Sequence, residues 1–227
     1  GSGWTEDDRA AVEGLVKNLE GIPLAIALAA GLAGDLSPGK LASVLSNRFL
    51  RMRAAEAVGP DRQQTLRATL QWSWERLSPW EQATLAQISV FRGAFPVPAA
   101  EAVVDLSPWP EAPWVPLVIQ SLLDRSMLQV VGDGADSGAP RFGMFASVRT
   151  FASEHLGRRG ALEAPDGRPA SGRGAVRAAE IRHGRFFARV GSEQTLESLH
   201  QPGGLRRLRV LLAEREELVA AAERAIV

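Results

Sequence analysis

The sequence predicts a mainly α-helical chain that contains one short β-hairpin and ends in a pair of long helices. Two observations predict this class. Apolar residues recur at steps of three and four over most of the chain, which is the period of helices with one buried face. Residues 127–131 and 141–145 instead flank a Gly- and Asp-rich stretch, which is the pattern of two strands joined by a long, loose tip.

The composition limits the classes of protein that fit this chain. Its 227 residues include no Cys, so neither a disulfide nor a Cys-based metal site can hold the fold. The net charge is zero, which gives no overall attraction to nucleic acid or to membranes. The longest apolar run, 22–34, is shorter than the roughly 20 residues of a membrane span, and no signal peptide is visible. We therefore expect a cytoplasmic protein, and residues 1–3 resemble a cloning scar.

Residues 4–58 are predicted to form a small helical bundle. Thr5 is a candidate N-cap followed by acidic residues, which the helix dipole favours in a first turn. Gly21 ends that helix, and Pro23 suits the first position of the next one because the missing N–H is not needed there. A Ser-Pro pair at 37–38 marks a third helix start.

Residues 59–157 have the element order of a winged-helix domain, in which helices are followed by a β-hairpin wing and a last helix. The first helix carries Leu66 and Leu70 at helical spacing. The next begins at a capping box formed by Ser78 and Glu81, with a Pro in its first turn. Further helical spacings follow at 98–104, 115–122 and 148–156.

The C-terminal part is predicted to be a linker followed by a helical hairpin. Residues 158–174 are rich in Gly, Arg, Pro and Ala and have no apolar period, which favours a linker. Their arginines could touch nucleic acid or an acidic partner, but a solvated loop is the interpretation we favour. Residues 175–227 are predicted to form helices at roughly 175–198 and 204–226, broken at Pro202-Gly203-Gly204.

No residue pattern indicates an enzyme. Residues 34–40 fit the G-x-x-x-x-G-K spacing of a phosphate-binding loop, in which Lys40 would reach the phosphates. However, Leu41 stands where such a loop has its Mg²⁺-binding hydroxyl, and the preceding segment is Ala-rich instead of strand-like. We therefore favour an accidental match at a helix start. The three His residues lack the Cys or carboxylate spacing of a metal site.

DNA binding by the winged helix is not expected. Such a domain reads the major groove with its third helix through cationic or amide side chains. The corresponding segment, 114–124, offers Gln120 and Asp124 and is otherwise apolar. Asp133 and Asp136 in the wing tip would repel phosphates.

A Gly-x-Pro-Leu turn enters an Ala-rich helix at Gly21–Ala30 and is followed by Arg62–Ser73, Leu77–Phe95 and Met144–Leu156. In that order, these segments resemble the back half of the nucleotide-binding module of STAND-class NTPases. This is the NB-ARC arrangement of bacterial AfsR/LuxR-type regulators, of Apaf-1-like proteins and of plant NLR receptors. Arg182–Phe187 resembles the opening of the helical region that follows this module in the bacterial regulators.

The resemblance implies a regulatory fragment of a signalling switch that is not an enzyme by itself, since the Walker A and B segments would belong to a P-loop domain upstream. That domain would be its intramolecular partner, and the active full-length protein would form a homo-oligomer. Residues 175–227 would begin a TPR-like sensor region. Two alternatives remain open from the sequence, a DNA-binding winged-helix module of a transcriptional regulator and a protein-interaction scaffold.

The same resemblance implies three cofactor-binding residues for ADP or ATP, which this fragment alone would not hold tightly. Pro23 would pack against the adenine, and Leu24 would help to line the pocket. Phe145 stands in the Met-x-x landmark where relatives place a phosphate-contacting His or an acid, and neither Phe145 nor Ala146 can make that contact.

Overall fold

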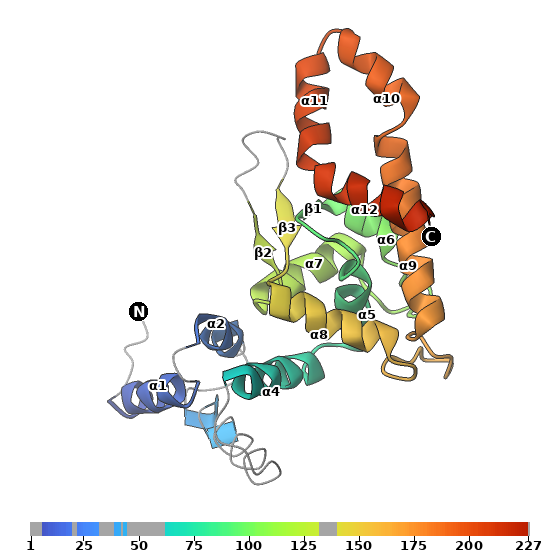
Figure 1. Cartoon of the computed structure of the whole chain (residues 1–227). Helices are drawn as coiled ribbons and strands as arrows, with labels where there is room; N and C mark the ends of the chain where they lie inside the picture. The colour runs from blue at the N-terminus through green and yellow to red at the C-terminus, as the bar shows by residue number, and fades with distance from the viewer. Residues whose placement is uncertain are drawn as a thin grey trace. The chain divides into compact units, whose positions relative to one another are not determined.

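The computed structural model describes residues 6–19, 22–31, 39–41, 43–44, 62–131 and 140–226. They form two compact units (Figure 1). The first unit comprises the described residues up to Leu77 together with Asp124–Ser126, and the second comprises the remainder. The prediction of a mainly α-helical chain with a short wing is confirmed, because helices alternate with a small three-stranded sheet.

The first unit is built from α1 (Glu6–Asn18), α2 (Pro23–Gly31) and α4 (Arg62–Glu75). As predicted, Pro23 is the first residue of α2. The buried cluster consists of Leu15, Leu19, Ala25, Ala29, Leu41, Ala68 and Trp72. Small residues on α2 let α4 pack closely against it, which is the role that an Ala-rich face serves in helix packing.

The helix α4 lies in the first unit, whereas the sequence analysis assigned 59–77 to the winged-helix domain. The reason is that Ala68 and Trp72 of α4 are buried in the cluster around α2. Period alone identifies the buried face of a helix but not the element that covers it. The predicted boundary at 58 and the predicted helix start at 37–38 lie outside the described residues.

The second unit contains the winged helix. Its elements are α5 (Pro79–Ile88), β1 (Phe95–Pro96), α6 (Val97–Val103), α7 (Val115–Asp124), β2 (Gln129–Val130), β3 (Arg141–Gly143) and α8 (Ala146–Gly157). The sheet order is β1-β3-β2, with both pairings antiparallel. Phe142 of β3 is opposite both Phe95 and Val130, so the wing hairpin is extended by the short strand β1.

The predicted capping box at the start of α5 is confirmed. The Ser78 N–H donates to Glu81 Oε2 at 2.6 Å, and the Glu81 N–H donates to Ser78 Oγ at 3.4 Å. Each side chain thereby pairs with a backbone N–H that has no partner within the helix. Strand β1 was missed because it is two residues long and one of them is Pro.

The C-terminal helices share the core of the winged helix. They are α9 (Arg173–Val190), α10 (Glu193–Glu197), the 3-10 turn η1 (Ser198–His200), α11 (Gly204–Ala213) and α12 (Arg215–Ile226). Phe91 stacks on Phe95 at 4.5 Å between ring centroids, and Phe187 of α9 meets Phe91 edge-on at 6.3 Å. All three rings are buried, so α9 completes this core and does not lie on it as a separate layer.

Two predictions about this part need correction. The segment expected as a linker is folded, because the Leu162 N–H donates to Ser171 Oγ at 3.0 Å and the Gly172 N–H to Leu156 O at 2.7 Å. Hydrogen bonds of the backbone N–H groups, one of them to a side chain, leave no apolar period in the sequence. The two long helices are each divided, the first at Gly191 and the second at Glu214. The predicted break at Gly203-Gly204 is confirmed.

Candidate functional site

The predicted nucleotide-contacting residues fall in different units. Pro23 is exposed and Leu24 half-buried at the start of α2, in the first unit. Phe145 is the N-cap of α8 in the second unit and is 37% exposed. Lys40 of the loop-like match is exposed in a helical stretch, and residues 34–38 of that match lie outside the described residues. Pro23 and Leu24 are sequence neighbours in the first unit, and Phe145 belongs to the second unit.

A buried polar network joins α9 and α12 to the winged helix. We call it the joint, and its members are Gln87, Gly93, Arg141, Arg182, His183, Glu214, Glu217 and Arg224. In Figure 1, α12 crosses α9 beside the β1–α6 segment. The contacts of the joint connect residues that are far apart in the sequence, so they form only in the folded unit.

The centre of the joint is a fully buried pair, His183 of α9 and Glu217 of α12. Their Nε2 and Oε2 atoms are 2.8 Å apart, and the side chains are 0% and 1% exposed. The N–H of Gly93, in the turn before β1, donates to Glu217 Oε1 at 2.6 Å. Both carboxylate oxygens of Glu217 are therefore paired, which offsets the cost of several kcal/mol that an unpaired buried charge would carry.

Arg224 fixes the orientation of this pair from the other side of the imidazole ring. One guanidinium N–H donates to His183 Nδ1 at 3.2 Å, and another donates to the Val90 carbonyl at 2.7 Å. Because a guanidinium can only donate, Nδ1 accepts and the ring proton lies on Nε2, which donates to Glu217. Burial lowers the pKa of Arg224, and the carboxylates of Glu180 and Glu217 oppose that shift.

A second contact, the ion pair of Arg141 and Glu214, connects the wing to the turn between α11 and α12. Arg141 of β3 forms two hydrogen bonds with the Glu214 carboxylate, and the Nη2–Oε2 distance is 3.0 Å. It also donates to the Ala94 carbonyl. The side chains are 13% and 4% exposed, and a bidentate pair of this kind fixes direction as well as distance.

A third connection runs from α9 to α5 and α6. Arg182 donates to the Val103 carbonyl at 2.6 Å and to Gln87 Oε1 at 2.7 Å. The same Gln87 amide is bonded in both directions to the backbone of Asp105. A pocket of about 150 Å³ lies beside these residues, with Trp109 on its wall. Burial lowers the pKa of Arg182, and the Asp105 carboxylate partly opposes this.

Asp105 responds to the same surroundings in the opposite sense. Burial acts to raise the pKa of its carboxyl, but the hydrogen bonds from Ser107 and the charge of Arg182 outweigh that effect. The Ser107 hydroxyl donates to Asp105 Oδ1 at 2.7 Å and its N–H donates at 3.0 Å. The net pKa of Asp105 is below its ordinary value, so Asp105 is an anion at neutral pH.

These contacts hold the second unit together. Over the described ranges, no group of three or more His, Asp or Glu side chains could hold a metal ion. None of the described helices is both long enough and apolar enough to cross a bilayer. In the sequence, Arg182 stands out only through a resemblance, and His183 is also one of three histidines without the spacing of a metal site. The sequence analysis missed Glu217, Arg141 and Glu214, since nothing local distinguishes them from solvated charges on amphipathic helices.

The face of α7 that would enter a DNA groove is apolar. Trp114 is 68% exposed just before the helix, and Leu117 is 60% exposed on it. Residues 115–124 contain no Lys or Arg. Arg141 of the wing is already paired with Glu214. The predicted wing-tip acids, Asp133 and Asp136, lie outside the described residues.

Comparison with known proteins finds relatives among mycobacterial proteins. The chain is 35% identical over 154 residues to a Mycobacterium tuberculosis (strain ATCC 25618 / H37Rv) protein named "Putative HTH-type transcriptional regulator Rv0890c", which covers 66% of this chain and 17% of that protein. It is 32% identical over 158 residues to the "Uncharacterized protein Rv0894" of the same strain, covering 70% of this chain and 39% of that protein.

The chain thus spans about a sixth of the length of the first relative. No family description matches it, and no solved structure matches it. The names of the relatives mention no nucleotide-binding module, so the resemblance to STAND-class NTPases stays a prediction. What the comparison establishes is similarity, over two thirds of the chain, to a protein named as a transcriptional regulator.

Proposed function

We propose that this chain is a regulatory segment of a transcriptional regulator, in which the winged helix and the C-terminal helices move as one body. The name of the 35% identical relative supports the first half of this proposal. The single observation that carries the second half is the buried His183–Glu217 pair, which connects α9, α12 and the turn at Gly93.

The energetics of the joint explain why these elements would move together. Removing the Glu217 carboxylate would leave the buried N–H groups of His183 and Gly93 without an acceptor, at a cost of about 1–3 kcal/mol for each unpaired group. Sliding α12 away from α9 would uncouple Glu217 from both His183 and Gly93. A displacement imposed on the C-terminal helices would therefore be passed to the winged helix before the joint opened.

Hydrogen exchange on the purified chain tests this proposal. Amides in α9 and α12 are expected to exchange together with those of α5 and α8, because one cooperative unit opens as a whole. Glu217→Ala should make α9 and α12 exchange much faster. The matched control is Glu223→Ala, whose carboxylate pairs with Arg92 at an exposed position. If α9 and α12 already exchange independently in the unaltered chain, the proposal is wrong.

A nucleotide role is the finer part of the proposal. Pro23 is exposed at the start of α2 and so is available to a pocket wall that another domain would complete. Support for ADP or ATP as the cofactor comes only from the sequence resemblance. We expect no tight binding and no hydrolysis by this chain alone. The test is equilibrium dialysis with radiolabelled ADP, using this chain and a longer protein that includes any upstream P-loop domain, with Pro23→Ala in both.

DNA binding by this chain is the second candidate, and the name of the relative favours it. The apolar face of α7 and the pairing of Arg141 argue for weak binding at most. Anisotropy titration with a random duplex at low salt is the direct test, since phosphate contacts are strongest there. If the chain binds the duplex and the binding weakens steeply with added salt, DNA binding replaces the proposal that the winged helix and the C-terminal helices move as one body. No binding would leave DNA recognition to another part of the regulator.

A further inference from the structure

The helix α11 presents a stripe of leucines to solvent. Leu205 is 77% exposed, Leu208 40% and Leu212 62%. Their spacing of three and four residues places them on one face of the helix. Gly204 is the only residue of α11 that is buried, and the main packing of the helix among the described residues is against η1 and α12. This exposed apolar face belongs to a helix that the rest of the described second unit does not cover.

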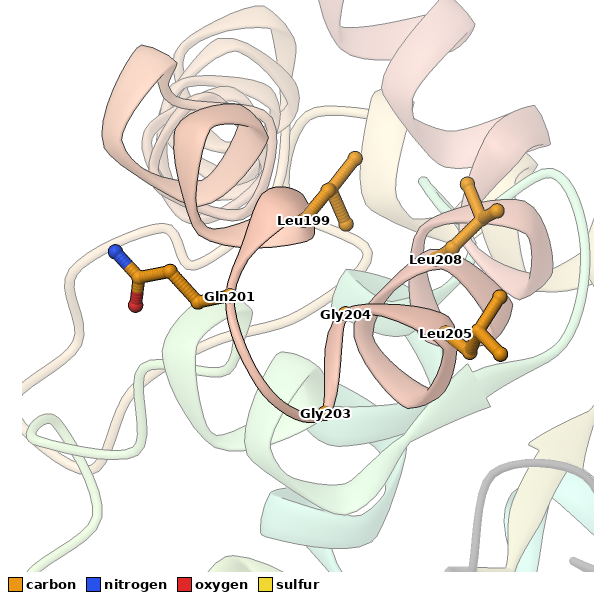
Figure 2. Close-up of a pocket in the computed structure, with 6 residues that line it drawn as sticks. All are labelled: Leu199, Gln201, Gly203, Gly204, Leu205 and Leu208. Carbon is orange, nitrogen blue, oxygen red and sulfur yellow. The ribbon is translucent and has the colours of Figure 1, made fainter.

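The stripe continues into a groove between η1 and α11. The groove has a volume of about 360 Å³, and Leu199, Leu205 and Leu208 line it together with Gln201 and two glycines. Figure 2 shows the three leucine side chains on the same side of the η1–α11 turn, whereas Gln201 points away from them. A pocket lined by leucines at helical spacing suits the apolar side chains of an incoming helix.

The turn that shapes the groove is tightly constrained. Gly203 has a φ of 84°, a conformation that other residues rarely adopt, and a Cβ on Gly204 would lie 1.8 Å from the Leu199 carbonyl oxygen. Arg207 donates to the carbonyls of Ser198 and Pro202 at 2.6 and 2.9 Å. The groove is therefore formed before any partner arrives, which lowers the entropic cost of binding.

The charge around the stripe selects the partner. Arg206 and Arg209 are exposed beside the leucines, and residues 204–213 contain no acidic residue. Two copies of α11 packed face to face would bring these arginines together, which disfavours a second copy. Of the acidic helices among the described residues, α1 has Leu15 buried in its own cluster and α12 has Glu217 in the joint, while α10 leads directly into η1 at the edge of the groove.

We propose that the α11 surface, formed by Leu199, Leu205, Leu208, Leu212, Arg206 and Arg209, binds an acidic amphipathic helix of a different protein. The leucines of that helix would fill the groove, and its carboxylates would pair with the two arginines. This proposal does not depend on whether the winged helix and the C-terminal helices move as one body, because the α11 surface lies outside the joint.

The probe is a fluorescein-labelled synthetic peptide with leucines at i, i+3 and i+7 flanked by glutamates, measured by fluorescence anisotropy. Binding is expected to the unaltered chain, and Leu208→Ser should weaken it by roughly tenfold or more, as expected for an apolar side chain of this size. Leu117→Ser is the matched control, because it removes a comparably exposed leucine from α7. Both positions are exposed, so both variants should fold.

Charge reversal provides the second arm of the test. Arg206→Glu with Arg209→Glu should abolish binding of the acidic peptide and create binding of the same peptide with lysines in place of glutamates. The proposal is overturned if the acidic peptide does not bind, or if it binds equally well to the charge-reversed and Leu208→Ser variants. It is also overturned if light scattering shows that the chain self-associates through Leu208, since the occupant would then be a second copy.

Discussion

The helices α11 and α12 are neighbours in sequence, and both are amphipathic, yet they have opposite surroundings. Glu217 of α12 is buried against His183, while Leu205 of α11 is 77% exposed. The acid is inside and the leucine is outside. The difference teaches that specific long-range partners decide burial here. An acidic side chain with two donors can lie in the interior, and a leucine is exposed where none of the described elements of the unit covers it.

The substitution with the largest expected effect on this contrast is Glu217→Ala. We expect it to lower the free energy of unfolding by about 1–3 kcal/mol for each of the two buried donors, His183 Nε2–H and the Gly93 N–H, that would lose their acceptor. Urea denaturation followed by Trp fluorescence measures this change. Glu223→Ala should cost about 0–1 kcal/mol, as expected for an exposed ion pair. Equal losses in the two variants would show that the joint does not stabilise the unit.

Gly204→Ala tests whether the α11 turn is as constrained as its geometry indicates. The added Cβ would overlap the Leu199 carbonyl oxygen, so the turn must open. We expect a loss of about 1–3 kcal/mol, the usual range for a forced steric shift. Hydrogen exchange should localise the change to η1 and α11 and leave α9 protected. Gly184→Ala on α9 is the control, because a Cβ there meets no atom within 4 Å.

The pH dependence of stability tests the contribution of Asp105, whose backbone is bonded to Gln87 at the edge of the joint. The pKa of Asp105 is lowered in the folded chain, so its contribution is present above its unfolded pKa of about 3.9 and is lost as the pH falls through the folded value. The stability difference between the unaltered chain and Asp105→Asn should therefore shrink as the solution is acidified below that pH. Denaturation midpoints across the acidic range measure it. A difference that does not change with pH would contradict the assignment.

The smallest expected effect is that of Leu212→Ser on α11. Since this side chain is 62% exposed, its loss should change the free energy of unfolding by no more than about 0.5 kcal/mol. Thermal denaturation is a sufficient measurement. Phe187→Ser, in the buried ring cluster, is the opposing case and should destabilise the unit strongly. A large loss from Leu212→Ser would mean that α11 is packed in solution and that its surface is not free.

Local chemistry made part of this fold predictable. Ser78 and Glu81 predicted the start of α5, and Gly203 with Gly204 predicted the break before α11. Both predictions were possible because a helix cap and a residue with positive φ depend on a few adjacent residues. The joint could not be found in this way. The pairing of His183 with Glu217 joins positions 34 residues apart, and neither residue type indicates burial. The packing partner of α4 was missed for the same reason, since the apolar face of a helix can pack against more than one neighbouring element.

The candidate nucleotide residues show where sequence reasoning depends on something outside the chain. Pro23 was placed correctly at a helix start, and this follows from the geometry of Pro. Its contact with adenine, the need for an upstream P-loop domain and the homo-oligomer of the active state remain predictions. A resemblance supplies them, and they concern parts that the described residues do not include.

The bidentate contact between Arg141 and Glu214 has a mechanical consequence. Glu214 lies at the point where α11 ends and α12 begins, and the strand that holds it belongs to the wing. In Figure 1, α11 runs from this point back to η1 and α10, which follow α9 in the chain. The helix is thus held at both ends, by Arg141 of β3 at Glu214 and by the hydrogen bonds of Arg207 to the η1 turn. A displacement of α11 would therefore act on the wing and on α9 together, because its two ends are connected to different parts of the same unit.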